Sequence, residues 1–328
     1  MEESRLFSKV YGCLLGGLIG DAMGAPVENW TWQDIENKYG ELSTFSGAGT
    51  DDSAVKQILC DVLIQHDGHI TGDEFAMGFM ENPQYYNLYF IPVRNMYHKL
   101  KDHLAAPREA GCGNMQSSSS AMAISPMGIV NACNPRQAAT ETFDVASIIH
   151  SGSTAFCCDA ACAMAAAVAQ AMMPETTVDE VLQAATKYLH SKSAELMINK
   201  IENALNIAKE VGEYRIFRER YYASCLEDVI CDSRETVPAA FAIFYLAQGD
   251  PKKSILFGVN FGRDADTIAS MVGALAGAYG GVEALEKSWI EQIERETIAH
   301  KDLAHSMTKL VTARALEMRK MADAILDV

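Results

Sequence analysis

Basic residues are scarce in this chain of 328 residues. Lysine and arginine together number 27 against 43 aspartates and glutamates, so the formal net charge is −16 at pH 7. An acidic surface repels the phosphates of nucleic acids and of anionic lipids. We therefore expect neither nucleic acid nor membrane partners, although this charge does not exclude a small anion in a local site.

Regular cysteine spacing is also missing. The nine cysteines form no CxxC pairs, and their odd number argues against a disulfide framework. Such cysteine usage favours a reducing cytosol. The first residues lack the basic region of a signal peptide, and no uninterrupted run reaches the roughly 18 apolar residues of a membrane span. The sequence thus predicts a cytoplasmic protein.

Alternating strand patterns are rare, whereas helical spacing of apolar residues is common. Glycines four apart in segment 5–24 predict a helix face that another helix can approach closely. Between the predicted helices, 106–120 is a predicted loop. Neither a repeat nor a long linker is evident, so we predict an all-α fold, with 1–328 forming one compact domain of a dozen or more helices. The predicted helices are 5–24, 52–66, 73–81, 135–149, 155–173, 177–191, 193–211, 235–248, 251–258, 265–279 and two more in 282–326.

Several common enzyme signatures are absent: the chain has no HExxH, no GxSxG and no dinucleotide fingerprint. It has instead two acidic helix starts, GAGTDDS at 47–53 and GRDADT at 262–267. A helix N-terminus favours one threonine or aspartate as a cap. Three consecutive oxygen-bearing side chains, Thr50, Asp51 and Asp52, exceed that need.

The second start precedes IASMVGALAGA, a run so apolar that it predicts a helix buried all round. Two carboxylates at its N-terminus would repel each other and lose hydration. Arg263 could partner one of them, or a divalent cation could satisfy both. Oxygen ligands suit Mg²⁺, Mn²⁺ or Ca²⁺, and two ions are plausible. The predicted ligands are Thr50, Asp51, Asp52, Asp264, Asp266 and Thr267.

Three further candidates carry weaker signals. Glu28 follows GDAMGAPV, and its spacing alone favours an ordinary surface carboxylate. The loop GCGNMQSSSS at 111–120 offers donors for a phosphate but lacks the lysine of a P-loop, so a flexible surface loop is an equal alternative. His150 follows an apolar run and fits a structural histidine.

The order of these motifs resembles the ADP-ribosylglycohydrolase family, from about Tyr11 to Gly281. The shared motifs are TDDS at 50–53, the Gly-Asn loop with Ala-Met and Pro at 113–126, His150 before an Ala-rich helix, and GRDADT with GALAGAYGG at 262–281. This resemblance implies an all-α orthogonal bundle with a binuclear Mg²⁺ site in a central cleft. The predicted ligands match the family's ligand positions, and 282–328 adds C-terminal helices.

The resemblance also implies roles for residues around the metals. Glu28 becomes a candidate catalytic residue, with Asp52 as the second. Candidate substrate-binding residues along the ADP-ribose cleft are Gly113, Asn114, Ser117 and His150. The activity implied is metal-dependent hydrolysis of an N- or O-glycosidic bond at the ribose anomeric carbon of an ADP-ribosylated substrate.

Departures from the family pattern leave the substrate open. Ser53 replaces a common threonine, and Arg263 and Ala265 replace a glycine and a threonine in the late motif. Arg263 adds a charge beside the metals, which makes it a further candidate for substrate binding. The alternatives are a hydrolase of another small ribosyl or furanosyl compound, a non-catalytic ADP-ribose binder, and a crystallin-like protein. The oligomeric state is not predicted.

Overall fold

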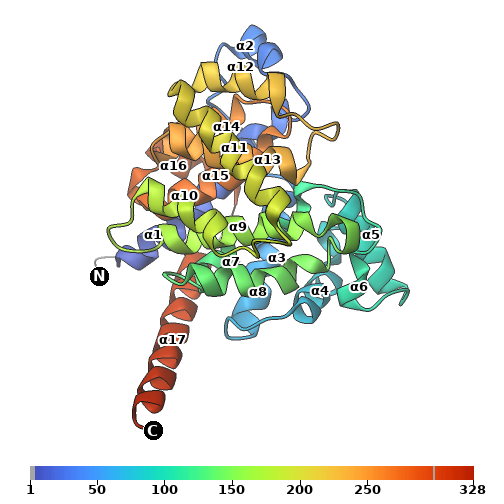
Figure 1. Ribbon diagram of the computed structural model, residues 1–328, viewed down its shortest axis with the longest axis vertical. Coiled ribbons are helices and arrows are strands. Elements are labelled where there is room, and N and C mark those ends of the chain that lie inside the picture. Colours follow the sequence, from blue (N-terminus) through green and yellow to red (C-terminus); the bar gives the residue numbers. More distant parts are fainter. Residues whose placement is uncertain (1–3, 298–299) are drawn as a thin grey trace.

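The computed structural model describes residues 4–297 and 300–328. Across these residues the regular structure is helical, with one isolated β-bridge between Cys112 and Ser151. Figure 1 shows the helices packed into one body from which only the end of α17 projects. The prediction of an all-α bundle of a dozen or more helices is confirmed. The α-helices are α1 (Arg5–Gly24), α2 (Trp32–Tyr39), α3 (Asp51–Gln65), α4 (Gly72–Glu81), α5 (Ile91–Lys101), α6 (Pro107–Ala110), α7 (Ser125–Val130), α8 (Pro135–Ser147), α9 (Phe156–Ala171), α10 (Val178–Lys187), α11 (Glu195–Val211), α12 (Tyr214–Ser224), α13 (Ser233–Leu246), α14 (Pro251–Val259), α15 (Ala265–Gly280), α16 (Lys287–Glu296) and α17 (His300–Leu326).

Helices α1 and α15 form the centre of the bundle and pack against each other at very short distance. A Cβ added to Gly16 would lie 2.2 Å from the carbonyl oxygen of Gly273. Contacts this short are possible only because both residues lack a side chain. At the end of α1, a Cβ on Gly24 would lie 2.4 Å from the Cα of Asp266. The predicted glycine face is confirmed, and it ends at a candidate metal ligand.

Several helices begin where local sequence dictates. Thr31, Thr71 and Thr177 each cap a helix, and each forms a reciprocal capping box with the acidic residue three positions later. Four helices, α2, α5, α7 and α12, were not predicted. The predicted loop 106–120 also contains a single helical turn, α6, which begins at Pro107.

Two stretches, Arg5–Val27 and Gly152–Ala171, are long and apolar enough to cross a membrane by length and composition. The prediction concerned uninterrupted apolar runs, whereas these two stretches qualify by mean hydropathy, which tolerates isolated polar residues. Within the protein, 89% and 78% of their apolar windows are buried. Such burial is typical of core helices that are apolar all round.

The last helix, α17, has two different halves. Its first half packs on the body through Ala304, Met307 and Val311, and Arg314 inserts a buried guanidinium that pairs with Glu141 at 2.9 Å. No residue from 315 to 328 is buried. That half projects from the body in Figure 1.

Candidate metal centre and active site

The start of α3 is capped by a residue from another helix. Asp21, fully buried at the end of α1, accepts hydrogen bonds from the backbone N–H of Thr50 at 2.9 Å and of Ser53 at 3.0 Å. The Thr50 hydroxyl also accepts from the N–H of Asp52. The amides of α3 therefore have their acceptors, and Asp51 and Asp52 are not needed as caps.

The start of α15 is not capped by its own aspartate. Asp264 is the N-cap residue, but its side chain makes no capping hydrogen bond. Its carboxylate instead accepts from the hydroxyl of Ser118 at 3.0 Å. Helix capping therefore does not explain the presence of the Asp264 carboxylate.

The two acidic starts meet in space. The Thr267 hydroxyl lies 3.3 Å from Asp52 Oδ2, and the Thr50 hydroxyl lies 3.5 Å from Asp266 Oδ2. The α1–α15 contact explains this meeting, because Gly24 at the end of α1 touches the backbone of Asp266. The structure thus brings these two parts of the predicted ligand set together.

Glu28 joins the same cluster from a third segment. One carboxylate oxygen from each of Glu28, Asp264 and Asp266 lies within 4.8 Å of the others. Glu28 is exposed, whereas the two aspartates are buried. The cluster therefore has a buried floor and a solvent-facing edge, and Glu28 occupies that edge.

Burial raises the pKa of the aspartates in this cluster. The pKa of Asp264 is raised to about 8 and that of Asp51 to about 6, in both cases mainly because the carboxylate loses hydration. Burial and neighbouring carboxylates raise the pKa values of Asp52 and Asp266 well above the usual range. Such crowding is costly for metal-free carboxylates and favours a bound cation.

A second observation also fits a cation. Asp52 Oδ1 and Asp266 Oδ1 are buried and accept no hydrogen bond from the described residues. Buried carboxylate oxygens normally have partners. Oxygens from carboxylates and threonine hydroxyls form the donor set that Mg²⁺, Mn²⁺ and Ca²⁺ prefer. The residues present therefore fit a hard divalent cation.

Sequence reasoning missed two residues that support the cluster. It assigned no role to Asp21 or to Lys56. The buried ammonium of Lys56 donates to the Ser270 hydroxyl at 3.1 Å and favours the charged form of Asp21, lowering that carboxyl's pKa against the larger effect of burial. A signal was present, because Lys56 follows Asp52 by one helical turn and shares its face.

The predicted substrate loop is partly open and partly buried. Gly113 is exposed, has a φ of 77° and has nothing within 4 Å of where a Cβ would lie. Asn114 is buried, and its amide donates to the carbonyls of Pro92 and Ile149. A bridge between Cys112 and Ser151 brings this loop beside the segment after His150.

His150 and Ser117 lie behind this surface. The His150 ring is fully buried, with Nε2 3.2 Å from the Ser117 hydroxyl and Nδ1 2.6 Å from the Ser120 hydroxyl. Burial lowers the pKa of His150 to about 4, so the ring is neutral at pH 7. In this geometry His150 braces the serine loop, and Ser118 of that loop contacts Asp264.

Arg263 points its guanidinium toward Glu235. Both carboxylate oxygens of Glu235 accept from it at 2.8 Å, and the carbonyl of Glu227 accepts at 2.7 Å. The structure thus directs this charge into a buried ion pair. The expectation that Arg263 contacts substrate stays a prediction.

A cavity of about 720 Å³ opens beside the cluster. Its lining includes Gly49, Thr50 and Ser53, and also His300 and Leu303 of α17. The cavity therefore touches the rim of the candidate site behind α3.

Comparison with known proteins shows the family to which the chain belongs. The family model for ADP-ribosylglycohydrolase matches residues 2–320. The chain therefore belongs to the ADP-ribosylglycohydrolase family, whose members hydrolyse glycosidic bonds.

Individual relatives are distant but cover nearly the whole chain. An uncharacterised protein of Archaeoglobus fulgidus is 27% identical, over 90% of this chain and 92% of its own length. The ADP-ribosylhydrolase ARH3 of Bos taurus is 25% identical, over 89% and 90%. The ADP-ribosyl-[dinitrogen reductase] glycohydrolase of Rhodospirillum rubrum is 24% identical, over 90% and 93%. A solved structure of an ADP-ribosylglycohydrolase-related protein complex has a TM-score of 0.71 at 20% identity, covering 94% of this chain and 99% of that one, which supports the fold.

Proposed function

We propose that this protein hydrolyses the N- or O-glycosidic bond at the ribose anomeric carbon of ADP-ribosylated substrates, and that it does so with divalent ions, Mg²⁺ or Mn²⁺. The observation that carries the proposal is the meeting of two acidic helix starts with Glu28, at a cluster whose buried oxygens Asp52 Oδ1 and Asp266 Oδ1 have no hydrogen-bond partner.

The chain's own residues divide the work. Thr50, Thr267 and the four aspartates of the two helix starts would hold the ions, and Asp52, buried at the centre, would also orient what they bind. Bound ions supply Lewis acidity toward the ribose hydroxyls and the attacking water. In the reaction the bond from C1″ to the leaving atom breaks, water oxygen bonds to C1″, and a water proton goes to the leaving group. Glu28, at the exposed edge, would accept and pass on that proton.

The carboxylates also suit the transition state. Glycoside cleavage develops positive charge on the ribose ring, and nearby carboxylates stabilise such an oxocarbenium-like state. The open backbone at Gly113 and at Gly152, which has a φ of 66° and no neighbour within 4 Å of a Cβ position, would approach the phosphates of ADP-ribose.

The test is release of free ADP-ribose from an arginine-ADP-ribosylated peptide, a serine-ADP-ribosylated peptide and a small riboside. We expect release from at least one ADP-ribosylated peptide with Mg²⁺ or Mn²⁺, and none in excess chelator. If metal-loaded protein releases only riboside products, the ADP-ribosyl substrate is wrong. If it cleaves none of the three, the proposed activity is wrong.

Glu28 provides the sharper variant. Glu28→Gln should lower kcat by at least about 100-fold, because a positioned acid or base contributes on that scale. Glu41→Gln, an exposed glutamate in the following loop, is the matched control and should leave kcat unchanged. Equal kcat for the Glu28→Gln variant and the wild type would remove Glu28 from the mechanism.

A further inference from the structure

A reciprocal pair of backbone hydrogen bonds ties together the two segments that carry Glu28 and Asp264. The N–H of Arg263 donates to the carbonyl of Trp30 at 2.7 Å, and the N–H of Asn29 donates to the carbonyl of Arg263 at 2.8 Å. Glu28 and Asp264 each adjoin this pair. The pair therefore explains why carboxylates so far apart in sequence come together.

The backbone at this junction is unusual. Asn29, Gly262 and Arg263 have φ values of 67°, 78° and 62°, in the left-handed region. Glycine and asparagine adopt that region readily, whereas an arginine seldom does. The turn before Asp264 therefore needs side-chain contacts to hold an arginine in this conformation.

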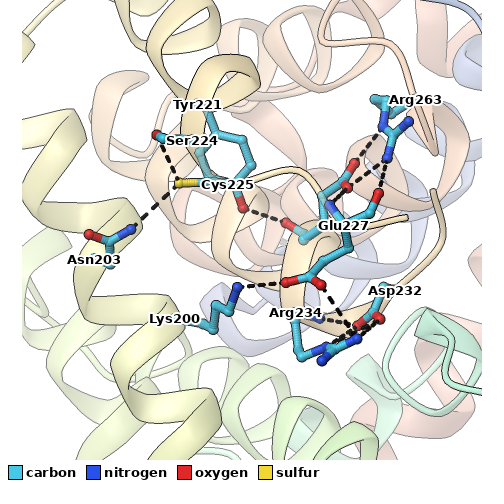
Figure 2. Close-up of polar contacts among 10 residues, drawn as sticks. Lys200, Asn203, Tyr221, Ser224, Cys225, Glu227, Asp232, Arg234 and Arg263 are labelled. Carbon is cyan, nitrogen blue, oxygen red and sulfur yellow. Dashed lines mark hydrogen bonds and ion pairs between the residues drawn. The ribbon is translucent and has the colours of Figure 1, made fainter. Parts of the chain in front are cut away.

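Glu235 supplies those contacts. A bidentate ion pair holds the Arg263 guanidinium, with Nε 2.8 Å from Glu235 Oε1 and Nη2 2.8 Å from Oε2. Figure 2 marks the contacts of Arg263 with dashed lines. Glu235 is fully buried, and its carboxylate also accepts from the backbone N–H of Glu227 at 2.7 Å. A bidentate pair fixes both the distance and the orientation of an arginine.

The segment leading into α13 holds Asp264 from a second side as well. The N–H of Ser118 donates to the carbonyl of Cys231 at 2.6 Å, and the Ser233 hydroxyl donates to the carbonyl of Ser117 at 2.6 Å. The Ser118 hydroxyl then donates to Asp264. The start of α13 and the segment before it thus hold the backbone of Asp264 through Arg263. They hold the carboxylate of Asp264 through Ser118.

Further ion pairs surround this segment, and Figure 2 draws them among Lys200, Glu227, Asp232 and Arg234. The Glu227 carboxylate lies 2.6 Å from Lys200 Nζ and 3.4 Å from Arg234 Nη2. Arg234 in turn pairs with buried Asp232 at 2.6 Å. These ion pairs restrain the segment that carries Glu235, as is needed for a residue that positions another.

We propose that Glu235 is a positioning residue for the metal centre. Through Arg263 it holds the turn at 262–263 in the left-handed conformation, so that Asp264, whose own φ is −83°, faces Glu28 and Asp266. This inference rests on the proposed function, because it assumes that these carboxylates bind a divalent ion. Glu235 acts through Arg263, and its effect is on how tightly the ion is held.

The first test measures Mn²⁺ affinity by isothermal titration calorimetry. Glu235→Gln should weaken Mn²⁺ binding by about tenfold or more, the scale found when residues that orient metal ligands are changed. Glu141→Gln is the matched control, since it removes the charge of a buried ion pair with Arg314 on another part of the body. Its Mn²⁺ affinity should equal that of the wild type. Thermal unfolding of both variants reports their folding.

A second variant separates positioning from general stability. Arg263→Gly allows the left-handed turn without a side-chain anchor, so it should bind Mn²⁺ nearly as tightly as the wild type. In that background, adding Glu235→Gln should change the affinity less than about twofold. If Glu235 only stabilised the fold, Glu235→Gln would weaken Mn²⁺ binding by the same factor in the wild-type and Arg263→Gly backgrounds, or would weaken it in neither.

The outcomes are distinguishable. Wild-type protein that binds no Mn²⁺ overturns the proposed metal site and this inference together. Wild-type binding with an unchanged Glu235→Gln variant, or an equal loss with and without Arg263→Gly, overturns this inference alone. A loss in Glu235→Gln that disappears in the Arg263→Gly background supports it.

Discussion

Without divalent ions, the protein should lose stability as the pH rises from 6.5 to 8. Burial raises the pKa of Asp264 from 3.8 to about 8. In this range the native carboxyl keeps a proton that the unfolded chain has already lost. Stability from this group is fully present below the unfolded pKa and is lost as the pH rises through the folded pKa.

The magnitude follows from linkage. One bound proton is worth about 1.4 kcal/mol per pH unit, so about 1.5 units on Asp264 alone cost roughly 2 kcal/mol. Asp52 and Asp266, with pKa values raised well above the usual range, act in the same direction. In a chain of 328 residues, 2 kcal/mol lowers Tm by about 3 °C. The window starts at 6.5 because His150 and His300, with pKa values lowered to about 4, destabilise the fold only at lower pH.

The assay is thermal unfolding at pH 6.5, 7.2 and 8, once in chelator and once with saturating Mg²⁺. In chelator Tm should fall with pH, while the increase in Tm caused by Mg²⁺ should grow, because ions compete with protons for the same oxygens. Asp264→Asn with Asp266→Asn should lose most of both dependences. A chelator-treated Tm that is flat or rises with pH, or a double variant with the wild-type slope, would refute the reasoning.

Three further predictions address the scaffold. Gly277→Ala should lower the free energy of unfolding by about 3 kcal/mol, read from Tm, because its Cβ would lie 1.9 Å from the Gly12 carbonyl oxygen. Gly280→Ala is the control, since the nearest neighbour of its Cβ would be 3.0 Å away. Equal losses in the two variants would contradict the α1–α15 explanation. Lys56→Met should lower the free energy of unfolding by about 3 kcal/mol, measured in urea, since it removes a buried cation near Asp21. Unchanged stability would mean that the Lys56 ammonium does not compensate the charge of Asp21. Ending the chain at Arg314 should cost less than about 1 kcal/mol, because no later residue is buried; a large drop in Tm would contradict that exposure.

The site residues that could be predicted from the sequence are those that the local helix structure does not require. Thr50, Asp51 and Asp52 supply more oxygens than a helix cap uses, and Asp264 and Asp266 precede an apolar helix. The glycines of α1 were recognised for the same reason, because four at regular spacing weaken a helix unless something packs there. Such residues can be found from sequence because the unusual pattern lies among neighbours in the chain.

The residues that it missed depend on partners far away in the chain. Glu235 looks like an ordinary acidic residue in the first turn of a helix, and only the fold places it against Arg263. The direction of Arg263 likewise depends on the left-handed turn at 262–263, which no propensity predicts for an arginine. Short helices such as α2 carry too few apolar positions to show a period.

The pairing of α1 with α15 also orders events in time. Roughly 240 residues separate these helices, so at about 5–20 residues per second the ribosome needs at least about 12 s to make α15 after α1. During that interval the glycine face of α1 has no partner, and such a distant contact forms slowly even once both helices exist. The acidic cluster therefore cannot form until α15 has been made, and a chain that ends before Asp264 cannot complete it.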